Sequence, residues 1–235
     1  MTRILAIADE VSEPLYGPAL ASLSPDLVLS CGDLPFDYLE YIVTVLSVPL
    51  LYVPGNHDPD LRRHPAEGFA EHRHDLLIGS GTGPDRALVK TYGPPPGPQG
   101  CVNVDGRIAE AAGLVVAGLG GSVNYAPGPN RYSQAEMRRR ALRLKARTVL
   151  RRPFGDRRVD VLIAHSPPLG VGDEPDDPAH AGFAAFHPLV DRLRPRLFLH
   201  GHVHPHGTAR PDRVLNGTRV VNVVPYKLLE VEEAA

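Results

Sequence analysis

Gly55-Asn56-His57-Asp58 follows a short apolar run, Pro49–Val53, and brings an amide, an imidazole and a carboxylate together within four residues. The apolar run has the length of a buried strand. Two more runs of this kind precede it, Ile4–Ala8 and Leu27–Ser30. A helix is expected between the second and third runs, from Asp37 through Tyr41–Leu46. This order of strand, helix or loop, strand, helix and strand is the βαβ pattern of an α/β fold.

Two helix starts carry the pattern of a capping box, in which a short polar residue and a Glu three positions later cap each other's backbone N–H groups. Asp37 with Glu40 opens the first helix, and Ser133 with Glu136 opens a second that runs to about Leu150.

The further elements expected are a hairpin of Arg107–Glu110 and Leu114–Gly118, a strand Val159–Ala164, a helix Phe183–Leu193, a strand Arg196–His200, and a hairpin of Val214–Asn216 and Arg219–Val223. No linker-like segment or repeat interrupts the chain, so we expect one domain over residues 1–235.

Polar side chains of metal-binding types follow five of the expected strands. They are Asp9, Asp33, Asn56, His165, and the pair His202 and His204 of Gly-His-Val-His. In open α/β sheets, ligands bind at the carboxyl ends of the strands, where such residues can converge. The sequence therefore predicts one polar site at this edge.

The residue types at this predicted site favour metal-assisted hydrolysis. Carboxylates and imidazoles with an amide oxygen, and without a thiolate, suit divalent Mn, Fe, Zn or Co. Two such ions, ~3.5–4 Å apart, can clamp the attacking and leaving oxygens of an in-line phosphoryl displacement. A water bound between them becomes a hydroxide nucleophile near neutral pH.

The ordered series Asp, Gly-Asp, Gly-Asn-His-Asp, His and Gly-His-x-His, which extends from Asp9 to His204, resembles the calcineurin-like metallophosphoesterases. Each motif alone is weak, but all five in order after strands form a specific pattern. The resemblance implies an α/β fold of two packed mixed β-sheets flanked by helices. It also implies metal-dependent hydrolysis of a phosphate ester at a site with two metal ions.

The resemblance also implies roles for the polar residues. Asp33 would bridge the two ions. The remaining metal ligands would be Asn56, His165 and His202 at one site, and Asp9 and His204 at the other. His57 would contact the phosphate or protonate the leaving group. Asp58 would orient the His57 ring, as carboxylates commonly orient imidazoles.

The first motif departs from the family pattern Asp-x-His, because Val11 stands where the histidine is expected. Valine cannot bind a metal, so the Asp9 site lacks one protein ligand. Glu10, Glu13 or a water could take this place. If strand geometry continues past Asp9, Glu10 points away from it, which favours water and a more weakly bound ion.

Three residues outside the motifs are candidates for substrate binding. Asn124 lies in the Gly/Pro-rich loop Gly118–Asn130, whose backbone N–H groups could cradle a phosphate. The alternative for this loop is a tight turn that needs positive φ at glycine. Arg131 could bind an anion, or be a solvated arginine ahead of the helix cap. His180 could reach the mouth of the site, or cap its own loop.

Composition places few limits on the partners. The formal net charge is −2, which gives no general reason to expect binding to nucleic acid or acidic membranes. The arginine-rich stretch 138–152 could bind nucleic acid, although such a helix face is more often solvated. The run Ile4–Ala8 is too short for a membrane span or a signal-peptide core, so we expect a cytoplasmic protein.

Three functions remain open from the sequence. The first is hydrolysis of a small phosphodiester, such as a nucleotide-derived ester, since the chain has no room for a large cap domain. The second is a non-catalytic scaffold of the same fold, which the missing first-motif histidine favours and the retained Asn56, His57, His165, His202 and His204 oppose. The third is a nuclease, which only the arginine-rich helix supports.

Overall fold

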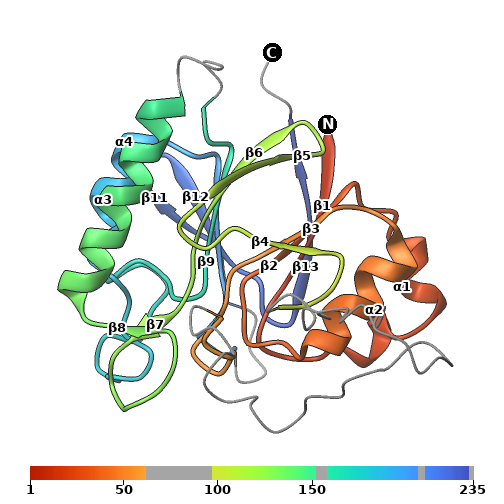
Figure 1. Ribbon diagram of the computed structural model, residues 1–235, viewed down its shortest axis with the longest axis horizontal. Coiled ribbons are helices and arrows are strands. Elements are labelled where there is room, and N and C mark those ends of the chain that lie inside the picture. Colours follow the sequence, from red (N-terminus) through yellow and green to blue (C-terminus); the bar gives the residue numbers. More distant parts are fainter. Residues whose placement is uncertain (62–96, 152–157, 206–209, 233–235) are drawn as a thin grey trace, which may run out of the picture.

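The computed structural model describes residues 1–61, 97–151, 158–205 and 210–232. In this part of the chain, two mixed β-sheets pack face to face, and helices cover their outer faces (Figure 1). The expected α/β fold of two packed mixed sheets flanked by helices is therefore confirmed.

The first sheet has five strands, in the order β13 (Tyr226–Val231), β1 (Thr2–Ile7), β2 (Leu27–Ser30), β3 (Leu50–Tyr52) and β4 (Cys101–Asn103). Strands β1 to β4 are parallel, whereas β13 pairs antiparallel with β1. The strands expected at Ile4–Ala8, Leu27–Ser30 and Pro49–Val53 are thus adjacent, and their carboxyl ends lie at one edge.

The second sheet has six strands, in the order β11 (Arg213–Leu215), β12 (Thr218–Asn222), β10 (Leu197–His200), β9 (Val161–Ala164), β6 (Leu114–Leu119) and β5 (Ile108–Ala111). Its four central strands are parallel, and both expected hairpins form its antiparallel edges. A short parallel pair joins β7 (Ser122–Val123), which lies within the expected loop Gly118–Asn130, to β8 (Arg131–Tyr132), which directly follows that loop.

Side-chain alternation along the strands builds three hydrophobic clusters. In β1 and the residue after it, Ile4, Ala6 and Ala8 lie in the core between the sheets, whereas Leu5 and Ile7 lie in the cluster under the helices. This is the two-residue period of a strand that is buried on both faces. The outer helices are α1 (Pro18–Ser22) and α2 (Phe36–Leu46) on the first sheet, and α3 (Gln134–Arg151) and α4 (Phe186–Leu193) on the second (Figure 1).

The two expected capping boxes have different outcomes. At α3 the Ser133 N–H donates to Glu136 Oε2 (2.8 Å) and the Glu136 N–H donates to Ser133 Oγ (3.2 Å), as predicted. At α2 the prediction is wrong, because Pro35 occupies the N-cap and Asp37 lies in the first turn. Glu40 accepts a hydrogen bond from the Gln99 N–H instead of returning to its own helix end.

Several other elements differ from the expectation. Helix α4 begins at Phe186 and not at Phe183, whose N–H bonds Pro167 O and so belongs to a loop contact. Strands β4 and β13 and the short η1 (Glu13–Leu15) were not predicted. Among the described residues, no helix is long and apolar enough to cross a bilayer.

The Ser133 cap yields a stability prediction. We expect Ser133→Ala to lower the free energy of unfolding by about 1 kcal/mol, which corresponds to roughly 2–4 °C in Tm for a chain of this size. Ser22→Ala is the matched control, because that exposed hydroxyl only bonds the Ala19 carbonyl of its own helix. Equal midpoints for both variants in urea unfolding would contradict a stabilising cap.

Candidate metal centre

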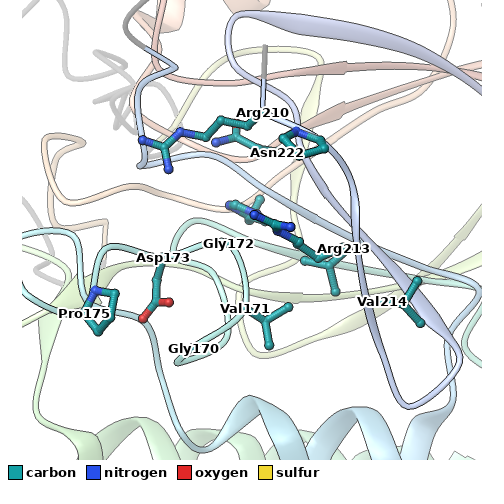
Figure 2. A pocket seen from close by; sticks show the side chains of 12 residues that line it. Gly170, Val171, Gly172, Asp173, Pro175, Arg210, Arg213, Val214 and Asn222 are labelled. Atoms are coloured by element: carbon teal, nitrogen blue, oxygen red, sulfur yellow. The ribbon is translucent and has the colours of Figure 1, made fainter. Parts of the chain in front are cut away.

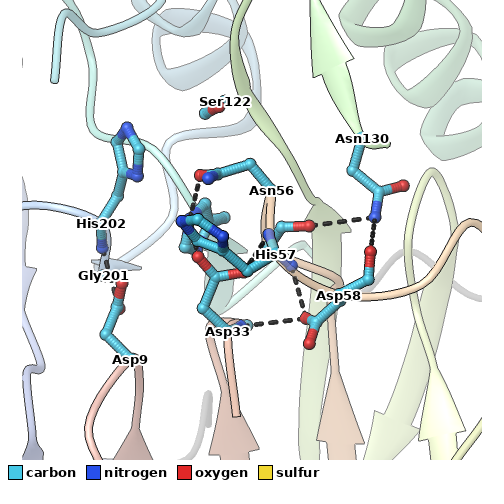
Figure 3. Close-up of polar contacts among 12 residues, drawn as sticks. Asp9, Asp33, Asn56, His57, Asp58, Ser122, Asn130, Gly201 and His202 are labelled. Atoms are coloured by element: carbon cyan, nitrogen blue, oxygen red, sulfur yellow. Dashed lines mark hydrogen bonds and ion pairs between the residues drawn. The ribbon is translucent and has the colours of Figure 1, made fainter. Parts of the chain in front are cut away.

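Five of the predicted polar residues come together where the carboxyl ends of the two sheets meet (Figure 3). They are Asp9 after β1, Asp33 after β2, Asn56 after β3, His165 after β9 and His202 after β10. Backbone hydrogen bonds join the strand ends, from Asp9 N to Gly32 O and from Gly201 N to His165 O. Because Asp9, Asp33 and Asn56 follow strands of the first sheet, and His165 and His202 follow strands of the second, the site spans both sheets.

Three of these residues adopt the left-handed backbone conformation, with φ of 62° at Asp9, 56° at Asp33 and 67° at His202. Such values are uncommon outside glycine, although Asp, Asn and His tolerate them best. Each lies two or three residues beyond the end of its strand, in the loop that follows. Strained residues of this kind cluster at functional sites, which agrees with the position of these three.

His165 lies at the centre of the cluster. Its Nδ1–H donates to the Cys31 carbonyl (2.8 Å), which fixes the ring. Its Nε2 lies 3.0 Å from Asn56 Oδ1 and 3.3 Å from Asp33 Oδ2. One imidazole nitrogen, one amide oxygen and one carboxylate oxygen thus face a single point.

The donor set fits a divalent metal. Asp9, Asp33 and His165 each offer one ligand atom, and these atoms all lie within 4.8 Å of one another. His165 is fully buried, and its Nδ1, the ring nitrogen that faces away from Asp33 and Asn56, is bonded to the Cys31 carbonyl. Such a bond is usual for a metal-binding histidine. Oxygen and imidazole donors suit borderline ions such as Mn, Fe, Zn or Co.

Burial and mutual charge determine the protonation of the metal-free cluster. Burial raises the pKa of Asp9 to about 6. Burial also disfavours the charged form of Asp33, but the interactions with His165 outweigh it and lower the Asp33 pKa to about 2. Burial disfavours protonated His165, yet the Asp33 and Asp9 carboxylates raise its pKa to about 9. Burial and the nearby His165 lower the pKa of His202 to about 3. A cation would thus replace a proton on His165.

Asp58 fixes the loops and does not orient His57, so that expectation is corrected. Its Oδ2 accepts the N–H groups of Gly55 (2.7 Å) and Asp33 (2.9 Å) (Figure 3). The His57 N–H donates to Asp33 Oδ1 (2.7 Å). Asp58 is turned towards the loop backbone because these buried N–H groups need an acceptor. His57 is exposed.

Asn130 holds the same loop from the other side and was missed by the sequence analysis. Its buried Nδ2 donates to Gly55 O and Asp58 O, both at 3.0 Å (Figure 3). Asn130 has a φ of 49°, and it precedes Arg131 at the end of a Gly/Pro-rich loop. Its neighbours in sequence offered no signal, since its partners lie about 70 residues away.

His202 and His180 form an imidazole cluster beside His165. The His202 N–H donates to Asp9 Oδ2 (2.9 Å), and the His202 ring Nε2–H donates to the Ala179 carbonyl (2.7 Å). The ring centroids lie 4.8 Å apart for His165 and His202, and 5.2 Å apart for His180 and His202. His180 binds Asp177 (2.6 Å), so it both caps its loop and borders the site.

Glu10 approaches the last motif, contrary to the geometry expected from a continuing strand. Its Oε1 lies 2.8 Å from His204 Nδ1, and both side chains are partly exposed. The left-handed conformation of Asp9 ends the alternation that would have turned Glu10 away. Val11 is 37% exposed, and Glu13 lies in η1. Of the two glutamates considered, Glu10 is therefore the one seen beside a predicted ligand.

The other predicted substrate residues are placed differently. The Arg131 guanidinium donates hydrogen bonds within its own loop, to Ala126 O and Pro127 O. Asn124 is exposed, and its N–H donates to Tyr132 O.

The glycines of this loop do not offer the cradle that was one of the two expectations. The Gly120 N–H donates to Asp105 Oδ1, and the Gly121 N–H donates to Pro54 O. Gly121 has a φ of 88°. These N–H groups are satisfied within the protein, which favours the tight turn.

A hollow of about 430 Å³ lies at the carboxyl ends of β10 and β12, beside the Gly-His-Val-His loop (Figure 2). His200, Arg210, Arg213 and Asn222 contribute polar groups to it. Arg210 forms an ion pair with Glu174 and donates to His204 O (3.3 Å), which links this wall to the loop that carries His204.

A model of the calcineurin-like phosphoesterase family matches residues 3–206, which include every motif described above. The chain belongs to this family. The family supports metal-dependent hydrolysis of phosphate esters and implies divalent ions at a site with two metals. The cluster of Asp9, Asp33 and His165 is the candidate for that centre in this chain.

Two crystal structures share the fold. One, at 18% identity, has a TM-score of 0.57, and the match covers 94% of this chain and 90% of the other. The other, the protein TT1561 of Thermus thermophilus, is 20% identical with a TM-score of 0.55, and covers 94% and 88%. The comparison with curated proteins gives no match. At these identities the likeness shows the fold alone.

Removal of the Asn130 amide tests the loop anchorage. We expect Asn130→Ala to destabilise the protein by about 2–3 kcal/mol, because two loop carbonyls lose their donor inside the protein. Asn216→Ala is the matched control, since Asn216 has the same φ of 49° and its amide donates only to the exposed Asp191 carboxylate. Urea unfolding of both variants separates the buried donor from the backbone strain, and equal losses would refute the role given to Asn130.

Metal uptake is expected to release protons. His165 has a pKa of about 9 without metal, so it is protonated at pH 7 and must lose that proton to bind an ion. We expect about one proton released per Mn²⁺ at pH 7, and an association constant that rises about tenfold per pH unit up to pH 9. Calorimetry in two buffers with different ionisation enthalpies measures this, and identical heats would contradict it.

Proposed function

We propose that this protein hydrolyses a small phosphodiester, such as a nucleotide-derived ester, at a centre that holds two divalent ions. The observation that carries this proposal is the convergence of Asp33 Oδ2 and Asn56 Oδ1 on His165 Nε2, at 3.3 and 3.0 Å. A purely structural cluster would not need three metal-type donors with an aligned, backbone-anchored imidazole.

Asp33 is the shared ligand in this proposal. Its Oδ2 faces His165, and its Oδ1 accepts the His57 N–H. Asn56, His165 and His202 complete the first site, and Asp9 and His204 hold the second. Glu10 lies beside His204 and supplies negative charge there, in place of the ligand lost at Val11. Because Glu10 and His204 are both partly exposed, we expect the second ion to be bound more weakly.

When bound, divalent ions supply Lewis-acid charge that stabilises the phosphoryl oxygens. The protein's own residues position the ester and move the proton. Asp58 and Asn130 hold the loop of Asn56 and His57 by four hydrogen bonds. His57 is exposed, and its ring donates a proton to the leaving oxygen as the bond from phosphorus to that oxygen breaks.

The preference for a small substrate draws support from a hollow that adjoins the Gly-His-Val-His loop and is lined by residues other than the proposed metal ligands. The hollow of about 430 Å³ beside the Gly-His-Val-His loop matches the scale of a small organic group. Arg213 and the neutral His200, whose pKa burial lowers to about 4, offer polar contacts to such a group. Nucleic acid would require a longer surface, and only the arginines of α3 favour it.

The decisive test compares a chromogenic phosphodiester with the matching monoester, after metal removal and Mn²⁺ addition. We expect metal-dependent hydrolysis with a preference for the diester. We expect a loss of at least about 100-fold in Asp33→Asn, because it replaces the shared carboxylate ligand, and even residues that only support metal ligands cost about 10- to 100-fold. Asp26→Asn is the control, since Asp26 binds the Arg3 N–H at the opposite end of β1. Inert wild-type protein with every metal and both esters would overturn the proposal.

A further inference from the structure

Tyr125 is an exposed residue between β7 and β8 whose hydroxyl reaches the border of the candidate centre. The hydroxyl oxygen lies 2.9 Å from Arg131 Nη2 and, in a longer contact, 3.5 Å from Asn56 Nδ2. Asn56 is one of the proposed metal ligands, so the phenol of Tyr125 lies beside the proposed metal centre. None of the sequence motifs includes Tyr125, because they follow strand ends.

The hydrogen atoms at this hydroxyl can be assigned from its neighbours. A guanidinium only donates, and Asn56 directs its amide nitrogen to Tyr125 because its oxygen faces His165. The phenol oxygen therefore accepts from both neighbours, and its own hydrogen needs a third partner. Among the described residues, no acceptor lies within hydrogen-bonding distance of it. The O–H is left to bind something from outside the protein.

Arg131 holds the phenol in this orientation. Its Nη1 donates to Pro127 O (2.7 Å) and Ala126 O (3.2 Å), and its guanidinium carbon lies 4.5 Å from the centre of the Tyr125 ring. A Cβ atom on Gly128 would lie 2.2 Å from Arg131 Nη1, so glycine leaves the space that the guanidinium fills. The loop thus holds the hydroxyl in place before any substrate binds.

We propose that the Tyr125 hydroxyl donates a hydrogen bond to a non-bridging phosphate oxygen of the substrate. The Arg131 guanidinium polarises the phenol and strengthens it as a donor towards an anion. Arg131 is a positioning residue here and acts through Tyr125, whereas Tyr125 itself touches the substrate. This inference rests on the proposed function and names a residue that recognises the phosphate.

The test uses Tyr125→Phe, which removes the hydroxyl and keeps the ring against Arg131. We expect kcat/KM for the diester to fall by about 10- to 100-fold, the range for one lost hydrogen bond to a charged group. The dissociation constant of inorganic phosphate, measured by calorimetry on the Mn²⁺-loaded protein, should rise by a similar factor. The affinity for Mn²⁺ itself should stay within about twofold, since the contact of the Tyr125 hydroxyl with Asn56 is long, at 3.5 Å, and involves the amide nitrogen and not the oxygen that would bind the ion.

Two further variants separate substrate contact from general effects. Tyr16→Phe is the matched control, because Tyr16 is exposed and packs on Tyr38 and Tyr41, outside the centre, and it should bind phosphate as the wild type does. Arg131→Lys keeps the charge but loses the forked geometry, so phosphate binding should weaken less than in Tyr125→Phe.

Two results would overturn the inference. One is unchanged phosphate affinity in Tyr125→Phe. The other is a loss of Mn²⁺ affinity in this variant with phosphate binding restored at saturating Mn²⁺, which would mean that the hydroxyl only orients Asn56. Phosphate binding needs no turnover, so a wild-type protein that binds phosphate through Tyr125 but hydrolyses neither ester would refute the proposed function alone.

Discussion

The close approach of the loops that follow β2 and β3 is the constraint on which the candidate centre depends. A Cβ atom on Gly32 would lie 2.4 Å from the Gly55 nitrogen, so the two backbones touch where no side chain fits. This contact lets the Asp58 carboxylate accept an N–H group from each loop. Asp33 is fixed as a result, and its two oxygens are directed to His57 N and to His165.

The strand-end residues were predictable because parallel strands bring their carboxyl ends to one edge. Five short apolar runs sufficed to place Asp9, Asp33, Asn56, His165 and His202 together. Residues from the loop between β7 and β8 were not predictable in the same way. Asn130 and Tyr125 reach the site through contacts with residues far away in sequence, and no local periodicity reports such contacts.

Local patterns succeeded only where the neighbouring backbone agreed with them. The same capping-box pattern was correct at Ser133 and wrong at Asp37, because the N-cap of that helix is Pro35, two residues earlier. The direction of Glu10 was misjudged for a related reason, because the left-handed Asp9 ends the strand alternation. In both cases one backbone dihedral outweighed the side-chain pattern around it, as tertiary context often does.

The three left-handed residues at the strand ends set heat resistance against activity. Asp9, Asp33 and His202 each hold a conformation that costs about 1–3 kcal/mol outside glycine. Glycine would relieve this strain, but at Asp9 and Asp33 it would also remove the carboxylates that accept the His202 and His57 N–H groups. Asp, Asp and His at these positions provide metal-type side chains at the cost of backbone strain. This agrees with the trade-off between stability and activity that is common at enzyme sites.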